Sequence, residues 1–495
     1  MNNIRKYAYA ILFVFALFAF FSCKAEPSNS DRPDNSPTDP DFGPGTGEST
    51  TEIKDSLPDG LDFGGVAINI IVRGDVDSAF EFYAEETGDI VDDAIFRRNR
   101  AVEDRLNVNL NVIQGPGWQS YSQALSLIRN SIKAGDQAYD VIAGWSTSIA
   151  PLSAEDLFSN LLELPHLNLS EAWWNKSITE ELTIADKLYF AAGDINLSLL
   201  SSSLIIFENN QIRQDYGLPN IYEAVFDGKW TLDYMDGLVK NIHQDLNGDG
   251  IMDDKDLFGA LWTNHNYCDA FLASSNIRFT AKGEGRIPYL DIERERLGNL
   301  TDKVYNFLYN NEGVLVTGLI GSVGGELEAI DMFKNGQAYI SAGYLLFASL
   351  YFRDMQSEYS IVPYPKYDEN QEKYMTLVQS GMSLLCLPEN CDKKEAVGAF
   401  FEAAASESYK NVSPTYFEVA MKVKYARDET SGKMLDIIRD GANFSFAYIY
   451  SGSIGNPYMV MRDLMMAKSN NFTSWHEKNE PKIEKALEKL VSQME

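Results

Sequence analysis

The sequence predicts an α/β protein with a mainly parallel sheet and two domains. Apolar strands and amphipathic helices alternate between residues 66 and 145, which is the order of βαβ units. Residues 61–495 are more than one ordinary core accommodates, so two domains are expected. Hydrophobic residues make up 45% of the chain and aromatic residues 12%, which is enough to fill two cores.

The chain begins with the features of an exported lipoprotein. A short positive region precedes an apolar run at residues 8–21, which has the length of a signal-peptide core and is shorter than the about 20 residues of a membrane span. Ser-Cys at the end of this run is typical of a lipoprotein processing site, so we expect residues 1–22 to be a signal peptide and Cys23 to carry a lipid. Phenylalanines stand where a lipobox usually has leucine and a small residue, which leaves a simple cleaved signal and an uncleaved anchor as alternatives. Each of these possibilities places the protein outside the cytoplasm.

Residues 23–60 are predicted to form a flexible tether. They are rich in Pro, Asp, Ser, Gly and Thr, and such a segment cannot bury enough apolar surface to offset its ordering entropy. We therefore expect the tether to join the lipid on Cys23 to a globular part that begins near Leu61.

The globular part opens with alternating strands and helices. The strand at 66–74 is an apolar run, the helix at 89–106 gathers its apolar residues on one face, and the strand at 107–113 alternates apolar residues with asparagine. A helix at 119–133 and a strand at 139–145 follow. These five elements predict parallel pairing of the three strands.

Further elements are predicted along the rest of the chain. The helix at 228–242 begins at Thr231, whose hydroxyl can accept a hydrogen bond from a free amide of the first turn. The other predicted elements are a strand at 187–195, a strand and helix at 202–218, a helix, turn and strand at 329–344, and a strand, loop and helix at 384–404.

Several segments follow one another along residues 61–495 in an order that is typical of one family. They are "DDAIFRRNRAVEDRLNV", "YDVIAGW", "AWWN", "KLYFAAGD", "GKWTLDYM", "DMFKNGQAYISAG", "IVPYPKYDE" and "PTYFEVAMKVKYARD". In this order the sequence resembles the extracellular solute-binding proteins of ABC sugar importers, the family that includes maltose-binding protein.

The resemblance implies a two-lobed periplasmic-binding-protein-like fold, with a ligand cleft between the lobes and three interlobe crossings. The crossings are expected near Ala192, Asp331 and Ser406, so that lobe 1 comprises 61–192 and 331–405 and lobe 2 comprises 193–330 and 406–495. The resemblance also implies the function of a monomeric, lipid-anchored protein outside the cytoplasm. Such a protein captures a carbohydrate, expected to be an oligosaccharide, and delivers it to the permease subunits of an ABC transporter.

The stretch "DLNGDGIMDDKD" at 245–256 has the oxygen spacing of an EF-hand calcium loop, with Gly250 at the sharp turn. The candidate ligands are Asp245, Asn247, Asp249, the Ile251 carbonyl, Asp253 and Asp256. In alginate-binding members of the resembled superfamily the closing carboxylate comes two places earlier, so Asp254 and Asp256 both stay open as the last ligand. The resemblance implies a structural Ca²⁺ remote from the sugar, and a solvated acidic turn without metal is the alternative.

Charge and motif content argue against several functions. The net charge of −30 disfavours nucleic acid, whose phosphates would be repelled. The sequence contains no GxSxG, HExxH or P-loop motif, and its four histidines lack ligand spacing. We therefore expect a protein that is not an enzyme. A secreted glycan-active enzyme with paired carboxylates and a surface adhesin are the alternatives.

Five residues at or just after predicted strand ends are candidates for the ligand cleft, because ligands in open α/β sheets bind beyond the carboxyl ends of the strands. They are Trp145, Asp194, Trp262, Asn264 and Tyr344. Aromatic faces match the apolar face of a pyranose, and Asp or Asn can bind its hydroxyls. Packing in the core is the alternative for each aromatic residue.

Three cysteines remain besides Cys23, an odd number for an exported domain. Cys386 and Cys391 flank a short loop and could pair if a turn brings them together. Two free buried thiols are the alternative.

Overall fold

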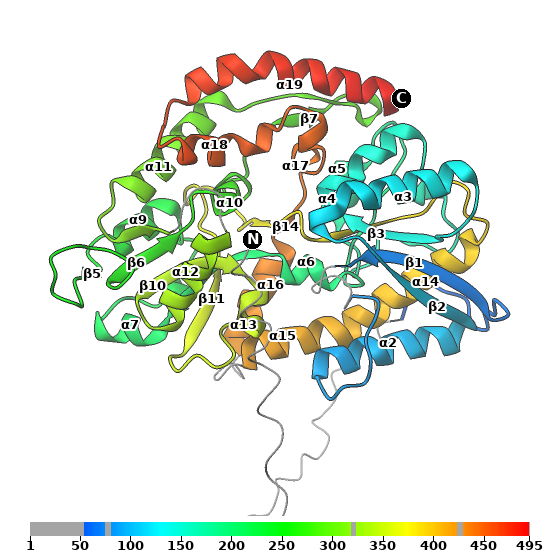
Figure 1. Ribbon diagram of the computed structural model, residues 1–495, viewed down its shortest axis with the longest axis horizontal. Helices are drawn as coiled ribbons and strands as arrows, with labels where there is room; N and C mark the ends of the chain where they lie inside the picture. The colour runs from blue at the N-terminus through cyan, green and yellow to red at the C-terminus, as the bar shows by residue number, and fades with distance from the viewer. Residues whose placement is uncertain (1–53, 75–80, 318–322, 423–428, 495) are drawn as a thin grey trace, which may run out of the picture. The chain divides into compact units, whose positions relative to one another are not determined.

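The computed structural model describes residues 54–74, 81–317, 323–422 and 429–494, and residues 53–495 form one compact unit (Figure 1). The predicted signal peptide, Cys23 and most of the predicted tether lie outside the described residues. None of the described helices has both the length and the apolar character that crossing a membrane requires.

The first sheet is built from the strands that the sequence predicts at its N-terminal end. Its order is β13 (Ser383–Cys386), β3 (Val141–Trp145), β1 (Val66–Arg73) and β2 (Val108–Gly115). Strand β1 pairs in parallel with both β2 and β3, whereas β13 is antiparallel to β3. The predicted parallel pairing of the first three strands is confirmed.

Helices cover both faces of this sheet because β1 alternates its buried side chains between them. Ile68 and Ile70 share a core with α2 (Ile90–Leu106) and α14 (Lys394–Glu407). Ile71 points the other way, toward α3 (Tyr121–Ala134) and α4 (Ser146–Ile149). Figure 1 shows the sheet between these two pairs of helices.

The second sheet is mixed, and its central strands are covered on both faces. Its order is β11 (Tyr359–Pro363), β4 (Leu204–Asn209), β10 (Ala338–Tyr344), β6 (Leu257–Trp262) and β5 (His243–Gln244), with β9 (Val314–Val316) also paired to β6. Strands β4 and β6 are buried at every position, as expected for central strands with helices on both faces.

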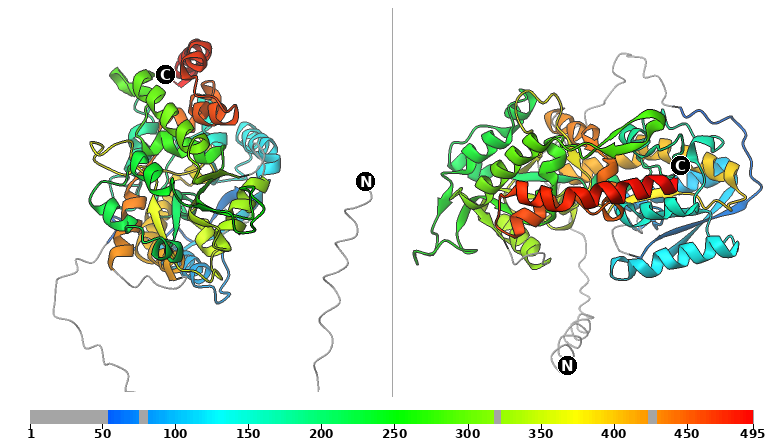
Figure 2. Two further views of the ribbon diagram at one scale, coloured as in Figure 1. Left: turned by 90° about the vertical axis from the view of Figure 1, so that its left-hand side faces the viewer. Right: turned by 90° about the horizontal axis from the view of Figure 1, so that it is seen from above.

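Other elements pack around the two sheets or join them. They are α5 (Lys176–Leu182), α6 (Leu197–Ser201), α7 (Asn210–Asp215), α8 (Ile221–Phe226), α9 (Leu232–Val239), α10 (Asn266–Ser274), α11 (Arg294–Tyr309), α12 (Val323–Lys334), α13 (Leu346–Leu350), α15 (Ser413–Lys422), α16 (Glu429–Asp440), α17 (Phe446–Ile449), α18 (Val460–Met466) and α19 (Phe472–Met494), with the two-stranded pairs β7 (Thr280–Lys282) and β8 (Pro288–Leu290), and β12 (Thr376–Leu377) and β14 (Ala442–Asn443). Helix α19 contacts residues 150–155 beside the first sheet as well as β8 and α11 beside the second, and Figure 2 shows it running along the molecule.

Local signals in the sequence set several element boundaries. The side chain of Asp89 accepts hydrogen bonds from the amides of Val91 and Asp92, which begins α2. The hydroxyl of Thr231 accepts from the Tyr234 amide at 3.2 Å, which confirms the predicted cap of α9. The strand predicted at 187–195 is wrong, because these residues make only isolated bridges, one of them between Ala191 and Leu385 of β13.

The predicted division between the lobes needs a correction. Residues 338–363, which the sequence assigned to lobe 1, provide β10 and β11 of the second sheet, because β10 pairs with both β4 and β6. The chain rejoins the first sheet only at β13, and beyond residue 406 helix α15 packs against α2 of the first lobe. Short strands of similar composition do not reveal which sheet they join.

The predicted tether also ends earlier than expected. Leu57 is buried in the core that contains α2, and the carboxylate of Asp55 accepts from Arg105 on that helix at 2.6 and 2.8 Å. This contact lowers the pKa of Asp55 although burial opposes it. A single apolar residue and one ion pair thus attach residues 55–57 to the domain.

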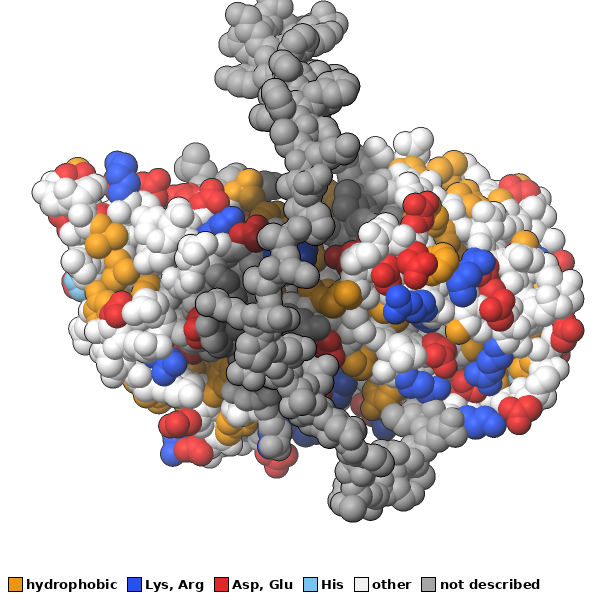
Figure 3. All heavy atoms as spheres, turned by 90° about the horizontal axis from the view of Figure 1, so that it is seen from below, with side chains coloured by type: hydrophobic (Ala, Val, Ile, Leu, Met, Phe, Trp, Pro, Cys, Tyr) orange, Lys and Arg blue, Asp and Glu red, His pale blue; other side chains and the backbone are white. Residues whose placement is uncertain are grey.

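Cys268, Cys386 and Cys391 are all free and buried, which answers the question of their pairing. Burial raises the pKa of the Cys391 thiol to about 11, so it is protonated at neutral pH. On the face shown in Figure 3, acidic and basic side chains are interspersed.

Candidate ligand-binding site

The carboxyl ends of β1, β2 and β3 meet at one edge of the first sheet, because these strands run parallel. Arg73 ends β1, Trp145 ends β3, and the turn Gly115-Pro116-Gly117 carries the chain from β2 to Trp118. The sequence therefore places a cation and two indole rings at the edge where a ligand is expected.

Three aromatic rings pack together at this edge, with Trp118 and Tyr121 stacked and Trp118 and Trp145 tilted by 37°. The Trp118 ring lies 4.2 Å from that of Trp145 and 5.3 Å from that of Tyr121, and the Arg73 guanidinium lies 4.8 Å from the centre of the Trp145 ring. Trp118 is 53% exposed and Tyr121 44%, whereas Trp145 is only 9% exposed. We call Trp118, Tyr121 and Trp145 the aromatic platform. Its two exposed rings offer the flat apolar surface on which a pyranose ring stacks.

A second group of polar and aromatic side chains lies at the carboxyl ends of β6 and β10 in the second sheet. The Asn266 side chain donates to the hydroxyl of Tyr344, which leaves the Tyr344 proton available for another acceptor. Tyr267 packs edge-on against Tyr344 and donates to a carboxylate oxygen of Glu326 at 2.6 Å. Burial raises the pKa of Glu326.

An arginine from α18 completes this second group. Arg462 donates through two nitrogens to the carboxylate of Asp269, and its third nitrogen lies 3.5 Å from Nε2 of His265. Burial raises the pKa of Asp269 to about 6, against the opposing effect of Arg462. Burial and the arginine charge together lower the pKa of His265, so this imidazole is neutral at pH 7.

The segment 379–382 connects the two groups. Ser146, directly after Trp145, donates its hydroxyl to the carbonyl of Ser380 and its amide to the carbonyl of Met382. Tyr448 of α17 is also hydrogen-bonded to Ser380 and lies close enough to Tyr344 to affect its pKa. These contacts place the platform and the second group around one region of the molecule.

The other three predicted cleft residues, Trp262, Asn264 and Asp194, make separate contacts of their own. Trp262 is fully buried and packs against Phe271 and Phe307, because β6 is covered on both faces. Asn264 donates to the Tyr309 hydroxyl at 3.3 Å. The carboxylate of Asp194 accepts from Ser413 of α15 at 2.5 Å, and burial raises its pKa to about 6.

The sequence analysis singled out Trp145 and Tyr344 but missed their neighbours. The turn before Trp118 was a usable signal, since a Gly-Pro-Gly turn after a parallel strand places the next side chain at the strand's carboxyl end. No comparable signal marks Arg462, because it lies 193 residues from its partner Asp269.

A buried arginine joins the segments that cross between the sheets. Arg98 of α2 is 3% exposed and donates to the carbonyls of Glu81 and Ile195, the Ser408 hydroxyl and the Asn99 side chain. Burial lowers its pKa to about 10, so it stays charged at pH 7. The buried carboxyl of Glu81 accepts from the Ser198 amide at 2.5 Å, and burial raises its pKa.

The loop 245–256 has the turn expected for a calcium site. Gly250 has a φ of +78°, and the Asp245 carboxylate accepts from the amides of Gly248 and Gly250 at 2.6 and 2.8 Å. The buried carboxylate of Asp256 accepts hydrogen bonds from the amides of Leu246 and Asp253. The bond from the Asp253 amide is the largest cause of the lowered pKa of Asp256. Asp254, by contrast, is exposed. Among the described residues, no three acidic, histidine or cysteine side chains converge as a metal site. The oxygen ligands and the glycine turn fit Ca²⁺. In this structure the carboxylates of Asp245 and Asp256 accept hydrogen bonds from backbone amides of the loop.

Several solved structures share the fold of this chain. A sugar transporter from Rhizobium etli, in an open conformation, is 14% identical with a TM-score of 0.52, over 87% of this chain and 99% of that one. The GacH receptor of Streptomyces glaucescens, whose structures include complexes with acarbose, is 12% identical with a TM-score of 0.51, over 87% and 100%. An ABC substrate-binding protein of Listeria monocytogenes in complex with cycloalternan is 14% identical with a TM-score of 0.50, over 87% and 98%.

No protein-family model and no curated protein matches the chain. The likeness to the solved structures establishes the two-lobed α/β fold of ABC solute-binding proteins, which confirms the predicted fold class.

Proposed function

We propose that the protein is an extracellular solute-binding protein that captures a carbohydrate and delivers it to the permease subunits of an ABC transporter. The aromatic platform is the observation that carries this proposal, because two of its rings are exposed at the strand edge where this fold binds ligands. The hydroxyl, amide and guanidinium groups around Tyr344 and Arg462 supply partners for sugar hydroxyls. The proposal includes a lipid on Cys23, a location outside the cytoplasm and a monomeric state, with no role for nucleic acid.

Titration of tryptophan fluorescence with a panel of mono- and oligosaccharides tests the proposal. Trp118→Ala should weaken the binding of any sugar by about fivefold or more, because truncating a central aromatic contact at a binding site typically costs more than about 1 kcal/mol. Tyr289→Ala is the matched control, since Tyr289 is 51% exposed but belongs to β8. Unchanged affinity of the Trp118 variant would remove the platform from the site.

Solute capture without turnover separates this function from its alternatives. The bound sugar should be recovered intact after prolonged incubation with the protein, as measured by chromatography. Release of shorter products would favour a glycan-active enzyme. Binding only to polymeric surfaces, with no affinity for a soluble sugar, would favour an adhesin.

We also propose that the loop 245–256 binds a structural Ca²⁺. Asp245, Asn247, Asp249, the Ile251 carbonyl and Asp253 would hold the ion, and Asp256 is the better closing ligand because its side chain already faces the loop. A bound ion would neutralise these clustered carboxylates and fix the loop.

A further inference from the structure

A fully buried carboxyl group, that of Glu81, lies where the chain crosses between the two sheets. Its backbone is attached to the first lobe, because Arg98 of α2 donates to the Glu81 carbonyl at 2.6 Å. The next residue is attached as well, since the Asn99 side chain donates to the carbonyl of Phe82 at 2.8 Å. Whatever the Glu81 side chain contacts is therefore held in a defined place relative to α2.

The Glu81 side chain contacts two of the segments that join the sheets. One carboxyl oxygen accepts from the amide of Ser198 on α6, and the amide of Ser383 on β13 donates to the Ser198 hydroxyl at 3.0 Å. Ser383 also lies close enough to the carboxyl to affect its pKa. The segment 379–382, which contacts Ser146 beside the platform, ends directly before Ser383. Glu81 thus fixes the point at which this segment joins the first sheet.

The hydrogen bonds around Glu81 favour a protonated carboxyl. Its second oxygen and the Ser383 hydroxyl are both buried, and neither has a hydrogen-bond partner among the residues that the structure describes. A buried carboxylate oxygen without a donor is costly. A protonated oxygen, by contrast, can donate to the serine hydroxyl.

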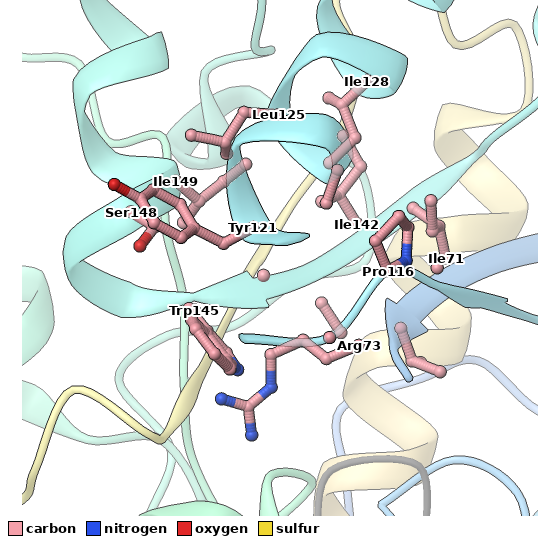
Figure 4. A pocket seen from close by; sticks show the side chains of 16 residues that line it. Ile71, Arg73, Pro116, Tyr121, Leu125, Ile128, Ile142, Trp145, Ser148 and Ile149 are labelled. Carbon is pink, nitrogen blue, oxygen red and sulfur yellow. The ribbon is translucent and has the colours of Figure 1, made fainter. Parts of the chain in front are cut away.

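Two cations face this carboxyl and oppose its protonation. They are Arg73 at the end of β1 and Arg98 of α2. Figure 4 shows the Arg73 guanidinium beside the Trp145 ring of the platform. Burial outweighs the attraction of the cations and raises the pKa of Glu81, and the serines that face it carry no charge. Burial therefore favours the same neutral form as the hydrogen bonds.

We propose that Glu81 is a positioning residue for ligand capture, which holds the segment 379–382 against the first sheet as a neutral acid. The inference rests on the proposed solute-binding function and concerns the regulation of that same site. Deprotonation would place a charge without a donor between the crossing segments. It would thereby weaken the binding of a ligand that contacts both the platform and the second group.

Calorimetric titration of the full chain with maltotetraose, and with the other sugars of the panel, tests this role. Glu81→Gln keeps an acceptor for Ser198 and a donor for Ser383, so its affinity at pH 6 should lie within about threefold of the wild-type value. Glu81→Leu should weaken binding by about tenfold, because apparent affinity falls with the population of the arrangement that binds.

The pH profile supplies a second measurement. Buried glutamates titrate at values up to about 8–9, so a scan from about pH 6 to about pH 10 spans the transition. Over this range the wild type should lose about tenfold more affinity than Glu81→Gln, because only the wild type can release the proton. Other titrating groups of the site, such as His265, are common to both proteins and cancel in this comparison.

Glu402 of α14 offers a matched control. It is also buried, its pKa is also raised by burial, and one of its oxygens has no partner among the described residues. Its other oxygen accepts from the Trp174 indole and the Asn168 amide rather than from a crossing segment. Glu402→Leu should therefore lower the stability of the fold but leave sugar affinity unchanged, and Glu402→Gln should keep the wild-type pH profile.

Each outcome supports or overturns the inference. Wild-type affinity in Glu81→Leu, or an equal loss in Glu402→Leu, would overturn the positioning role. A loss in Glu81→Gln as large as in Glu81→Leu, or equal pH profiles of Glu81→Gln and the wild type, would overturn the neutral acid.

Hydrogen exchange tests the role of Glu81 without any ligand. Exchange of residues 379–386, corrected for the intrinsic effect of pH, should rise with pH in the wild type and stay constant in Glu81→Gln. Equal exchange in the two proteins would overturn this inference whether or not a sugar binds. Absence of binding across the whole sugar panel would overturn the proposed function instead.

Discussion

Replacing Arg98 by methionine should strongly destabilise the protein, because this side chain holds two crossing segments against the first lobe. It is 3% exposed and donates to Glu81, Ile195 and Ser408 as well as to its neighbour Asn99. Methionine keeps the apolar stem and removes all five donors. Four buried acceptors lose their donor, and each one left without a partner costs about 1–3 kcal/mol, a sum that removal of the buried charge partly offsets. We therefore expect the free energy of unfolding to fall by about 3–5 kcal/mol.

Urea unfolding followed by tryptophan fluorescence measures this loss, and the chain offers a matched control. Arg97 precedes Arg98 on the same helix but is 69% exposed, with ion pairs to Glu86 and Asp93 at 3.7 Å. Arg97→Met should cost less than about 1 kcal/mol, since exposed ion pairs contribute little. Equal losses for the two variants would refute the claim that Arg98 anchors the crossings.

Three further predictions concern other parts of the chain. Asp194→Asn should be more stable than the wild type at pH 8 by about 2–3 kcal/mol. The folded-state pKa of about 6 lies above the ordinary value of Asp, so the wild type loses stability as pH rises from the ordinary pKa to the folded-state pKa. Melting curves should show that the variant has no stability advantage below pH 4. Chelation of calcium should lower the melting temperature, because an ion at a hundredfold excess over Kd stabilises the folded state by about 2.7 kcal/mol. Asp249→Ala should reproduce this effect without changing sugar affinity. Equal calorimetric melting with and without chelator would mean that the loop binds no ion. Cys23→Ala should release the protein from the membrane fraction or block its processing, and unchanged membrane attachment and mass would contradict the lipid anchor.

Local structure was largely predictable from the sequence because short-range signals determine it. The helix at 89–106 has its cap at Asp89 and its apolar residues on one face, and the structure has α2 within one residue of that range. The strand pattern at 66–145 also indicated parallel pairing, since the alternation of strands and helices leaves few other topologies. Membership of β10 and β11 in the second sheet was not predictable, because it depends on pairing with strands 75 or more residues away rather than on local composition.

The candidate site was predictable only where a strand end carries an aromatic residue. Trp145 and Trp262 look alike in the sequence, since each ends an apolar strand, yet only Trp145 lies next to exposed rings. The difference arises from what covers each strand: Phe271 and Phe307 enclose Trp262, and both come from helices after β6. Burial of a strand end is a tertiary property, so the sequence could propose both residues and could not separate them.

The segment 379–382 gives a physical reason why ligand capture and lobe movement would be coupled. It contacts Ser146 beside the platform, contacts Tyr448 beside the second group, and leads directly into β13 of the first sheet. A ligand that bridges Trp118 and Tyr344 would contact both of the groups that this segment connects. A ligand can shift the equilibrium between two lobe arrangements only if it binds one arrangement more tightly than the other. A site divided between two sheets provides such a difference, because only one arrangement of the lobes allows the ligand to make both sets of contacts. A ligand bound to the platform alone would gain the stacking energy and leave the lobes unmoved.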